Sequence, residues 1–579
     1  MATTTKLGRV GLVLKGVYSA ETAYKKLDVV TYNGSAYAAL HDVVGSPPTT
    51  SDDWQPIADV SAAIDAADAA ADSANTAAAL ANDAAEAANE LPNRINELAA
   101  DVQRIDWKTG VKKYVVRWDK TSAQCTRMAD AADIPTDTTH FAHRGSIDAD
   151  YSNPFDSVYP WSHRRLCKVN RTQYASIYDA GGDIKGAISY WEDEPGFTLG
   201  GDDPDQMDMV YTPAFWASVW EDENYVYAGV ADGEVQGWIK HPETIGARYL
   251  ASEDADGNLT SLAGGIPKRF TAISALHSNA KAQRMTLDDI FTWCDDTLLM
   301  VVEYATMNTQ TAIGNGVSSL YREDETGHPL EDAQQSNSVV LPTAYKTQAI
   351  AGALLDIGTS KGNGNVAIRV VTGVADHTNT AYCIVSFAGE PVDILTTHYC
   401  AIHGKYNSPD ADIGSKSGYI GSNGQSIAYY RGRIAFGNMW RYVLGAYRQT
   451  GTGHIWVANN RQEANNYDAL NTDVHTDTGC ALPQGAGGAA GEGYLNALHI
   501  LPDLPLAPFG AATGGNSTNP VGDYVYTPAL SAGNTILLAG AIAPYGAIVG
   551  RFCGYWGVSA SNSWWGQAAL LFLIPPEGV

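Results

Sequence analysis

The sequence predicts a multidomain protein: a small all-β module at the N-terminus, an α-helical coiled-coil stalk, and a large C-terminal region that mixes strands with a few helices. Three observations support this prediction. The chain has 579 residues, more than one hydrophobic core usually organises. It contains 57 Gly and 31 Tyr, a composition that favours strands joined by many turns. An Ala-rich segment that begins near residue 60 interrupts this pattern and has helical periodicity.

Residues 1–59 are the first predicted domain. Asn33-Gly34 separates two strand-like runs, Val29–Tyr32 and Ser35–Ala39, and both turn positions tolerate the positive φ of a tight hairpin. The order of aromatic residues around this hairpin resembles small carbohydrate-binding modules related to chitin-binding domains, and similar modules occur near the N-termini of phage tail proteins. The resemblance implies that exposed rings stack on sugars, or that the domain attaches the chain to the tail. The candidate glycan-binding residues are Tyr18, Tyr24, Tyr32, Tyr37 and Trp54. Packing of the same rings into a small core is the alternative.

Residues 60–110 are predicted to form a coiled-coil oligomerisation stalk. Apolar positions from Val60 to Ala88 alternate by steps of four and three, which is the spacing of a heptad seam. An alanine seam buries little surface, so such a helix needs partner helices for stability. We therefore expect a homo-oligomer, and by analogy with tail fibres a homotrimer. A flexible Ala-rich linker is the alternative.

Residues 111–320 are predicted to be the β-rich first part of the C-terminal region. Lys113–Asp119 is strand-like, and aromatic residues recur at short intervals between turns. One helix is well indicated after residue 286. Thr286 can cap it, and Leu287, Ile290 and Cys294 share one of its faces.

Several stretches of the C-terminal region resemble a large set of phage and prophage tail proteins. They include Val302–Gln310 (Val-Glu-Tyr-Ala-Thr-Met-Asn-Thr-Gln) and Ser426–Gly445, which contains Tyr-Arg-Gly and Gly-Asn-Met-Trp. In the second stretch we expect a short helix that directs Met439 and Trp440 into a core. The resemblance implies that residues 321–579 form an α+β C-type-lectin-like receptor-binding domain with β-rich inserts. The variable receptor-binding proteins of diversity-generating retroelements use the same fold, and their binding residues lie just before the final strand.

The stretch in that position here is 541–574. Its apolar end, Ala568–Ile574, predicts a buried strand, and the residues before it are rich in Tyr, Trp, Ser, Asn and Gly. Rigid rings combined with adaptable hydrogen-bonding groups are typical of binding surfaces. The candidate receptor-binding residues are Tyr545, Arg551, Cys553, Tyr555, Trp556, Ser559, Ser561, Asn562, Ser563 and Trp564. For Trp556, Trp564 and Trp565, burial in a core is the alternative.

Catalytic and metal-binding patterns are weak in this sequence. His398, Cys400 and His403 lie close together, but no second cluster supplies a fourth zinc ligand. Asp254–Asn258 resembles part of a calcium loop, yet Ala263 stands where the bidentate Glu belongs. We therefore expect no metal, no cofactor and no catalysis. A polysaccharide-degrading tailspike and a purely structural tail component are the alternatives.

The net charge and the cysteine pattern limit which partners and which cellular location the sequence favours. A net charge of -27 disfavours nucleic-acid binding, which needs clustered Lys and Arg. The 7 Cys residues form no CxxC pair, which fits synthesis in a reducing cytoplasm. We expect neither a signal peptide nor membrane insertion, because no sufficiently long apolar run occurs. The expected location is the virion, in the phage tail, acting at the exterior of the host cell. The expected partners are a bacterial cell-surface receptor (glycan or protein), other copies of the chain, and other tail or baseplate proteins.

Overall fold

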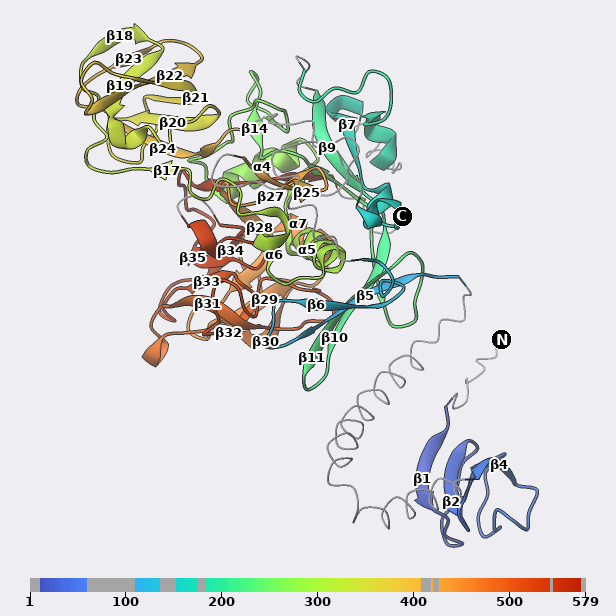
Figure 1. Ribbon diagram of the computed structural model, residues 1–579. Coiled ribbons are helices and arrows are strands. Elements are labelled where there is room, and N and C mark those ends of the chain that lie inside the picture. The colour runs from blue at the N-terminus through green and yellow to red at the C-terminus, as the bar shows by residue number, and fades with distance from the viewer. Residues whose placement is uncertain are drawn as a thin grey trace, which may run out of the picture. The chain divides into compact units, whose positions relative to one another are not determined.

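The computed structural model describes residues 11–59, 110–135, 153–173, 184–201, 203, 205–407, 418–419, 426–541 and 545–573 (Figure 1). The chain divides into two compact units, Met1–Ile105 and Asp106–Val579. The predicted domain boundary at residue 320 lies inside the second unit.

The first unit contains a four-stranded sheet in the order β1-β2-β3-β4. Its strands are β1 (Val13–Val17), β2 (Asp28–Tyr32), β3 (Ser35–Ala39) and β4 (Trp54–Asp59). β1 runs parallel to β2, and the other neighbours are antiparallel. The hairpin expected at Asn33-Gly34 joins β2 to β3, and both residues have positive φ, 50° and 80°. A small core of Tyr24, Val30, Ala39, Val43 and Trp54 lies against this sheet.

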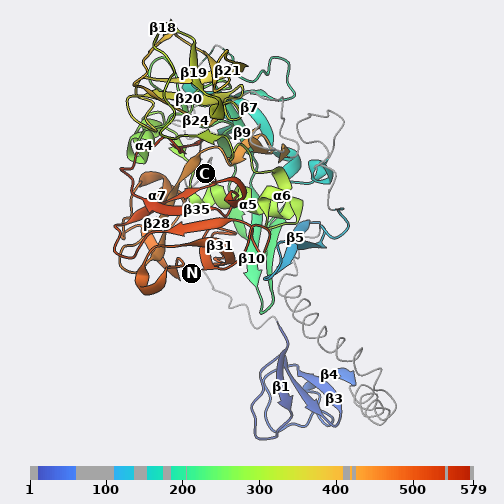
Figure 2. The ribbon, with the colours of Figure 1, turned by 60° about the vertical axis from the view of Figure 1, so that its left-hand side comes forward.

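The second unit is built around a buried helix, α5 (Ile290–Tyr304), which lies in the middle of the unit in Figures 1 and 2. Every residue of α5 except Phe291 is buried. The helix was expected in this region, but its N-cap is Asp289 rather than Thr286. Oδ1 of Asp289 accepts a hydrogen bond from the Thr292 backbone N–H at 2.7 Å, while Thr286 lies in a short strand. A helix buried on all sides lacks the polar face that would mark its limits in the sequence.

Two sheets formed largely from residues before 290 belong to this unit. A five-stranded sheet has the order β12-β10-β11-β5-β6, and one of its faces contacts α5. Its strands are β5 (Lys113–Asp119), β6 (Cys125–Ala129), β10 (Phe215–Glu221), β11 (Tyr225–Ala231) and β12 (Ile239–His241). A six-stranded sheet, here called the β9 sheet, has the order β16-β37-β13-β9-β7-β8. Its strands are β7 (Arg165–Asn170), β8 (Ile188–Trp191), β9 (Gln206–Thr212), β13 (Thr244–Ala247), β16 (Thr286–Leu287) and β37 (Leu571–Leu573).

A nine-stranded sheet contains most of the C-terminal strands. Its main order is β30-β29-β28-β34-β35-β33-β31-β32, and β36 pairs with β28 in addition. The strands are β28 (Trp440–Arg448), β29 (His454–Ala458), β30 (His475–Ala481), β31 (Gly491–Leu498), β32 (Gly510–Thr513), β33 (Tyr524–Thr527), β34 (Thr535–Ala539), β35 (Gly554–Val558) and β36 (Gln567–Ala568). The prediction of a short helix around Met439 and Trp440 is wrong, because Trp440–Arg448 is the strand β28. Met439 and Trp440 are nevertheless buried, as predicted.

Residues 321–405 form a six-stranded sheet, here called the β20 sheet, in the order β17-β24-β20-β21-β22-β19. It projects from one end of the unit, drawn in yellow in Figures 1 and 2. Its strands are β17 (Tyr321–Arg322), β19 (Ser338–Pro342), β20 (Ala353–Gly358), β21 (Ala367–Asp376), β22 (Tyr382–Ala388) and β24 (Tyr399–Lys405). The short pair β18 (Ala333–Ser336) and β23 (Val392–Ile394) accompanies it.

The remaining elements are short. The other strands are β14 (Ser252–Glu253), β15 (Leu259–Thr260), β25 (Gly418–Tyr419), β26 (Ala428–Tyr430) and β27 (Arg433–Phe436). The other α-helices are α4 (Ile273–Ala282), α6 (Thr309–Ile313) and α7 (Arg461–Asn466). Single 3-10 turns occur at Pro154–Ser157, Trp161–His163, Ile184–Ala187, Thr343–Tyr345, Ala486–Gly488 and Gly546–Ile548.

The predicted fold class is wrong. The protein is predominantly β, with 41% of it in strands, rather than a β module joined by a coiled coil to an α+β lectin-like domain. None of the helices among the described residues is long, and the longest is α5. The segment 60–109, where the stalk was predicted, lies outside the described residues. The α+β expectation failed because segments such as 440–448 are buried strands, in which apolar periodicity does not distinguish strand from helix.

Candidate binding surface

The structure separates the predicted receptor-binding residues by their exposure. The buried residues are Arg551, Cys553 and Trp556. The half-buried residues are Tyr545, Tyr555 and Asn562, and the exposed residues are Ser559, Ser561, Ser563 and Trp564. This division follows from β35, where burial alternates along the strand, so that Tyr555 faces outward between the inward-facing Gly554 and Trp556.

Arg551 lies beneath the surface and attaches this stretch to α5. Its guanidinium carbon lies 3.7 Å from the ring centroid of Trp293. Nη2 donates to the Trp293 carbonyl at 2.7 Å and Nε donates to Thr297 Oγ1 at 3.0 Å. Burial lowers the pKa of this guanidinium to about 9. These contacts make Arg551 an anchor for the stretch, whereas sequence reasoning placed it at the receptor.

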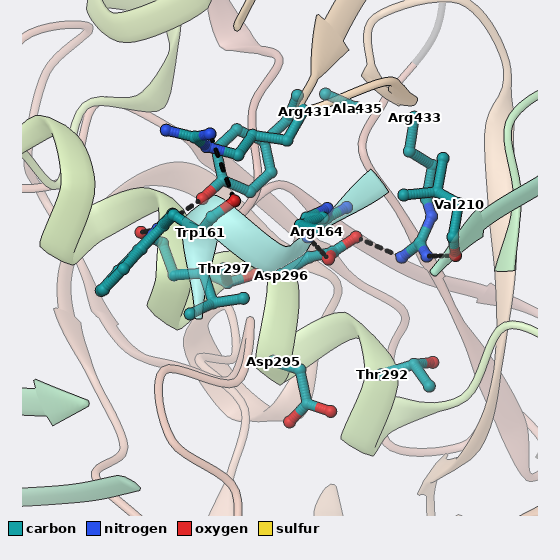
Figure 3. Close-up of polar contacts among 12 residues, drawn as sticks. Trp161, Arg164, Val210, Thr292, Asp295, Asp296, Thr297, Arg431, Arg433 and Ala435 are labelled. Carbon is teal, nitrogen blue, oxygen red and sulfur yellow. Dashed lines mark hydrogen bonds and ion pairs between the residues drawn. The ribbon is translucent and has the colours of Figure 1, made fainter. Parts of the chain in front are cut away.

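A network of buried ion pairs fixes α5 itself, as Figure 3 shows for Asp296. Its carboxylate oxygens lie 2.6 Å from Nη1 of Arg164 and 2.7 Å from Nη1 of Arg433. Burial alone would raise the pKa of Asp296, but the two guanidinium groups hold it far below its usual range. Two turns further along the helix, Glu303 pairs with Arg431 at 2.6 Å. Because each of these charges is paired, the network gives the surface above a rigid support.

Cys553 and Trp556 belong to the core side of the nine-stranded sheet. The Trp556 ring packs against Phe509 with ring centroids 5.9 Å apart. Burial raises the pKa of the Cys553 thiol well above its usual value, so the group is neutral. For Trp556, the alternative of core packing is the one that the structure shows.

The outward side of β31, β33 and β35, together with Tyr545 from the turn before β35, carries a group of tyrosines and one glutamate that we call the tyrosine face. Its members are Glu492, Tyr494, Tyr524, Tyr526, Tyr545 and Tyr555. Across the strands Tyr494 is opposite Tyr524, Glu492 is opposite Tyr526, and Tyr526 is opposite Tyr555. The rings of Tyr526 and Tyr555 stack at 4.7 Å with planes at 13°, and those of Tyr494 and Tyr524 meet at 5.3 Å and 84°. All five tyrosines are half-buried and Glu492 is exposed.

Trp440 links Tyr545 to the rest of the tyrosine face. Its ring centroid lies 5.9 Å from that of Tyr545 and 5.7 Å from that of Tyr555. The turn that follows Tyr545 is held by Ser318, whose Oγ donates to the Gly546 carbonyl at 3.1 Å. Residues 542–544, just before Tyr545, lie outside the described residues.

Sequence reasoning identified two of these tyrosines and missed Tyr494, Tyr524 and Tyr526. The missed residues lie 15 to 47 positions before residue 541, where the predicted stretch begins, and only sheet register brings them to it. The alternation of Tyr524-Val525-Tyr526 was the available signal, because it marks a half-buried strand with tyrosines on one side.

The exposed part of the predicted stretch adjoins a second aromatic stack. Trp565 is buried, and its ring lies on that of His403, with centroids 3.8 Å apart and planes at 6°. Trp564 is 39% exposed and leans on Trp565 at 4.8 Å. The Oγ atoms of Ser559 and Ser561 lie 3.0 Å apart on the same exposed segment. Of the three tryptophans considered, Trp564 is therefore the one that faces solvent.

His403 connects this stack to the β20 sheet. Its Nδ1 lies 2.6 Å from Oδ2 of Asp356 and its Nε2 lies 2.9 Å from Oε2 of Glu323. Arg269 pairs with the other oxygen of Asp356 at 2.5 Å. Burial would raise the pKa of Asp356, but Arg269 and His403 lower it to about 2. Among the described residues, no group of three or more His, Cys, Asp or Glu side chains is placed to hold a metal ion.

The N-terminal aromatic residues are mainly core residues. Tyr24 and Trp54 are buried, whereas Tyr18, Tyr32 and Tyr37 are half-buried. Tyr18 stacks on Tyr24 at 5.7 Å and meets the Trp54 ring edge-on at 5.9 Å. Trp54 Nε1 donates to the Ser46 carbonyl at 2.9 Å. Burial leaves Tyr24 and Trp54 no open ring face for a sugar.

Within the described ranges, no helix is long and apolar enough to cross a membrane. No protein-family model matches the chain, and no curated protein matches it either.

Proposed function

We propose that this chain is a non-enzymatic receptor-binding protein of a phage tail fibre. In this proposal, the tyrosine face and the adjoining residues 559–564 contact a receptor on the bacterial surface. The observation that carries the proposal is the row of half-buried tyrosines, whose strand β35 leads directly into the exposed residues Ser559, Ser561, Ser563 and Trp564. The phage assignment rests on the resemblance of residues 302–310 and 426–445 to phage tail proteins.

The tyrosine face has the physical properties of a recognition surface. Tyrosine provides a large contact area and a hydroxyl group with only two side-chain torsions, so ordering it on binding costs little entropy. Cross-strand ring contacts already restrict these side chains before any ligand arrives. Arg551 and Trp556 fix the backbone from beneath. Because these side chains are already ordered, the surface pays a smaller entropic cost when it binds a receptor.

Adsorption of the purified protein to host cells tests the proposal. Labelled protein is incubated with the bacterium on which the phage carrying this gene grows, and cell-bound label is measured. We expect Y526A/Y555A to reduce adsorption by more than about tenfold, because central aromatic residues carry most of an interface's energy. The matched control is Y190A, which removes an exposed tyrosine (41% exposed) from β8 in the β9 sheet. Equal adsorption of the double variant and Y190A would place the receptor site elsewhere.

The same preparation separates binding from polysaccharide degradation. The protein is incubated with surface glycan from the same cells, and released reducing ends are followed over time. We expect no release above a heat-treated control. Sustained release would favour the polysaccharide-degrading alternative.

A further inference from the structure

Two rings of the tyrosine face form a corner. Tyr494 and Tyr524 are opposite each other on β31 and β33, with ring centroids 5.3 Å apart and planes at 84°. Because the two ring planes are nearly perpendicular, one face of each ring borders the same space between them. Both side chains are half-buried, so their positions are fixed while part of each ring remains at the surface.

A carboxylate lies beside this corner. Glu492 is exposed, lies two residues before Tyr494 on the same side of β31, and is opposite Tyr526. Burial and then the carboxylate of Glu492 raise the pKa of Tyr524. The pKa of Tyr545 is raised mainly by burial, and further by Cys553, Glu492 and Tyr524. The negative charge of Glu492 therefore raises the pKa of two of the rings.

The electrostatics of this corner favour a cation. The face of an aromatic ring is the negative side of its quadrupole, and it attracts an ammonium group within about 6 Å of the centroid. A nearby carboxylate adds a direct Coulombic attraction. The net charge of -27 on the whole chain further raises the local concentration of cations.

A neutral sugar fits this part of the face less well. A sugar ring stacks on an open, flat aromatic face, whereas Tyr526 and Tyr555 stack on each other at 4.7 Å and cover one face of each ring. The Tyr494–Tyr524 corner offers two walls at a right angle instead. Such walls enclose a compact, rounded group better than a flat one.

We infer that the corner of Tyr494 and Tyr524, together with Glu492, binds an organic ammonium group carried by the receptor. This inference rests on the proposed function, and it specifies which chemical group of the receptor the tyrosine face recognises. The ammonium can be quaternary, as in choline, or primary, as in ethanolamine, because both carry the positive charge that the site attracts.

Ligand-observed NMR titrations of the full-length protein test the inference. The probes are choline, ethanolamine and 3,3-dimethylbutan-1-ol, which has the shape of choline without its charge. We expect at least one of the two cations to bind about tenfold more tightly than the uncharged alcohol. The order of the two cations shows whether methyl groups or N–H donors are preferred. Failure of both cations to bind, or an affinity for the alcohol equal to that for the tighter-binding cation, would overturn the inference.

Three variants assign the binding to the corner. Y524A should weaken cation binding by about tenfold, Y524F should retain it because the ring remains, and E492Q should weaken it several-fold. Y190A is the control for tyrosine removal. Near-ultraviolet circular dichroism shows whether Y524A folds. If it does not, E492Q still tests the site, because Glu492 is exposed and its substitution should not disturb folding. Cation binding that is unchanged in E492Q, and in Y524A where that variant folds, would refute this location.

The inference and the proposed function fail in different ways. If tyrosine variants lose adsorption to cells but wild-type protein does not bind choline or ethanolamine, the inference falls and the receptor-binding proposal stands. If the cations bind and adsorption does not depend on the tyrosine face, the proposed function falls.

Discussion

Asp523 is a buried carboxyl group immediately before the tyrosines of β33. Its Oδ2 accepts a hydrogen bond from the Phe552 backbone N–H at 2.7 Å, which ties β33 to the turn before β35. A Cβ atom on Gly550 would lie 2.2 Å from Oδ1 of Asp523, so the carboxyl group can approach this turn only because residue 550 is glycine. Burial raises the pKa of Asp523 well above its usual value. The group is therefore harder to ionise in the folded protein than in the unfolded chain.

This raised pKa predicts how Asp523→Asn changes stability with pH. Between about pH 4 and the folded-state pKa, the unfolded chain releases the Asp523 proton while the folded protein retains it. The contribution of Asp523 to stability is therefore full below pH 4 and falls as pH rises, by about 1.4 kcal/mol per pH unit. Asparagine does not titrate. We expect the unfolding midpoint of Asp523→Asn, relative to wild type, to rise from pH 4 to pH 7. Parallel midpoint curves would contradict this assignment.

Residue-scale reasoning from the sequence found part of the surface. Tyr545, Tyr555 and Trp564 were recognised because they are large polar aromatics close to a final apolar strand. Arg551 was assigned to the receptor because an arginine is usually exposed, whereas here it lies against Trp293. The burial of Arg551 could not be predicted from the sequence, because the ring and the backbone carbonyl that it contacts belong to Trp293, more than 200 residues away.

At the scale of elements, α5 shows how buried charges join a helix to its surroundings. Asp296 on the helix contacts Arg164, which precedes β7, and Arg433, which begins β27. None of the three side chains is more than 8% exposed. Removing one partner leaves a buried charge that is only partly compensated, which is the costly case for an ion pair.

We expect Arg433→Met to lower the free energy of unfolding by about 3 kcal/mol or more, because Asp296 loses one of its two guanidinium partners. Lys346→Met is the matched control, since it removes a cation from the exposed pair with Asp376 and should change stability little. Denaturant unfolding followed by tryptophan fluorescence measures both variants. A similar loss in the two variants would show that the buried pair is not specifically important.

The limits of sequence reasoning at this scale have a physical cause. The hairpin at Asn33-Gly34 was predictable because turn chemistry is local. The strand β28 was taken for a short helix because all its residues are buried, and a strand covered on both faces has no alternation to reveal it. The sheet orders were not predictable, because they depend on pairings such as that of β5 with β11, more than 100 residues apart.

At the scale of the whole second unit, the C-terminal strand completes a sheet that begins far earlier in the chain. β37 lies between β13 and β16, with Leu573 opposite Ile245 and Phe572 opposite Thr286. The Phe572 ring also lies against Arg433, 4.8 Å from its guanidinium carbon, and Gly246 provides the space for this ring. Strand β37, which follows the proposed binding surface, and the much earlier strands β13 and β16 are therefore parts of one core.

This topology predicts that the binding surface cannot be separated from the end of the chain. A protein that stops at Trp565 loses β36 and β37, which leaves β13 and β16 without their common neighbour. The buried side chains of Leu571, Phe572 and Leu573 are lost with them, each worth about 2–5 kcal/mol by analogy with core truncations. Losses of this size, about 6–15 kcal/mol together, match the usual stability of a folded domain. We expect the second unit of the truncated protein to lose its cooperative unfolding transition and its resistance to limited proteolysis. A soluble truncated protein with the wild-type midpoint would show that β37 is dispensable, and the single variant Phe572→Ala should lower that midpoint without abolishing the transition.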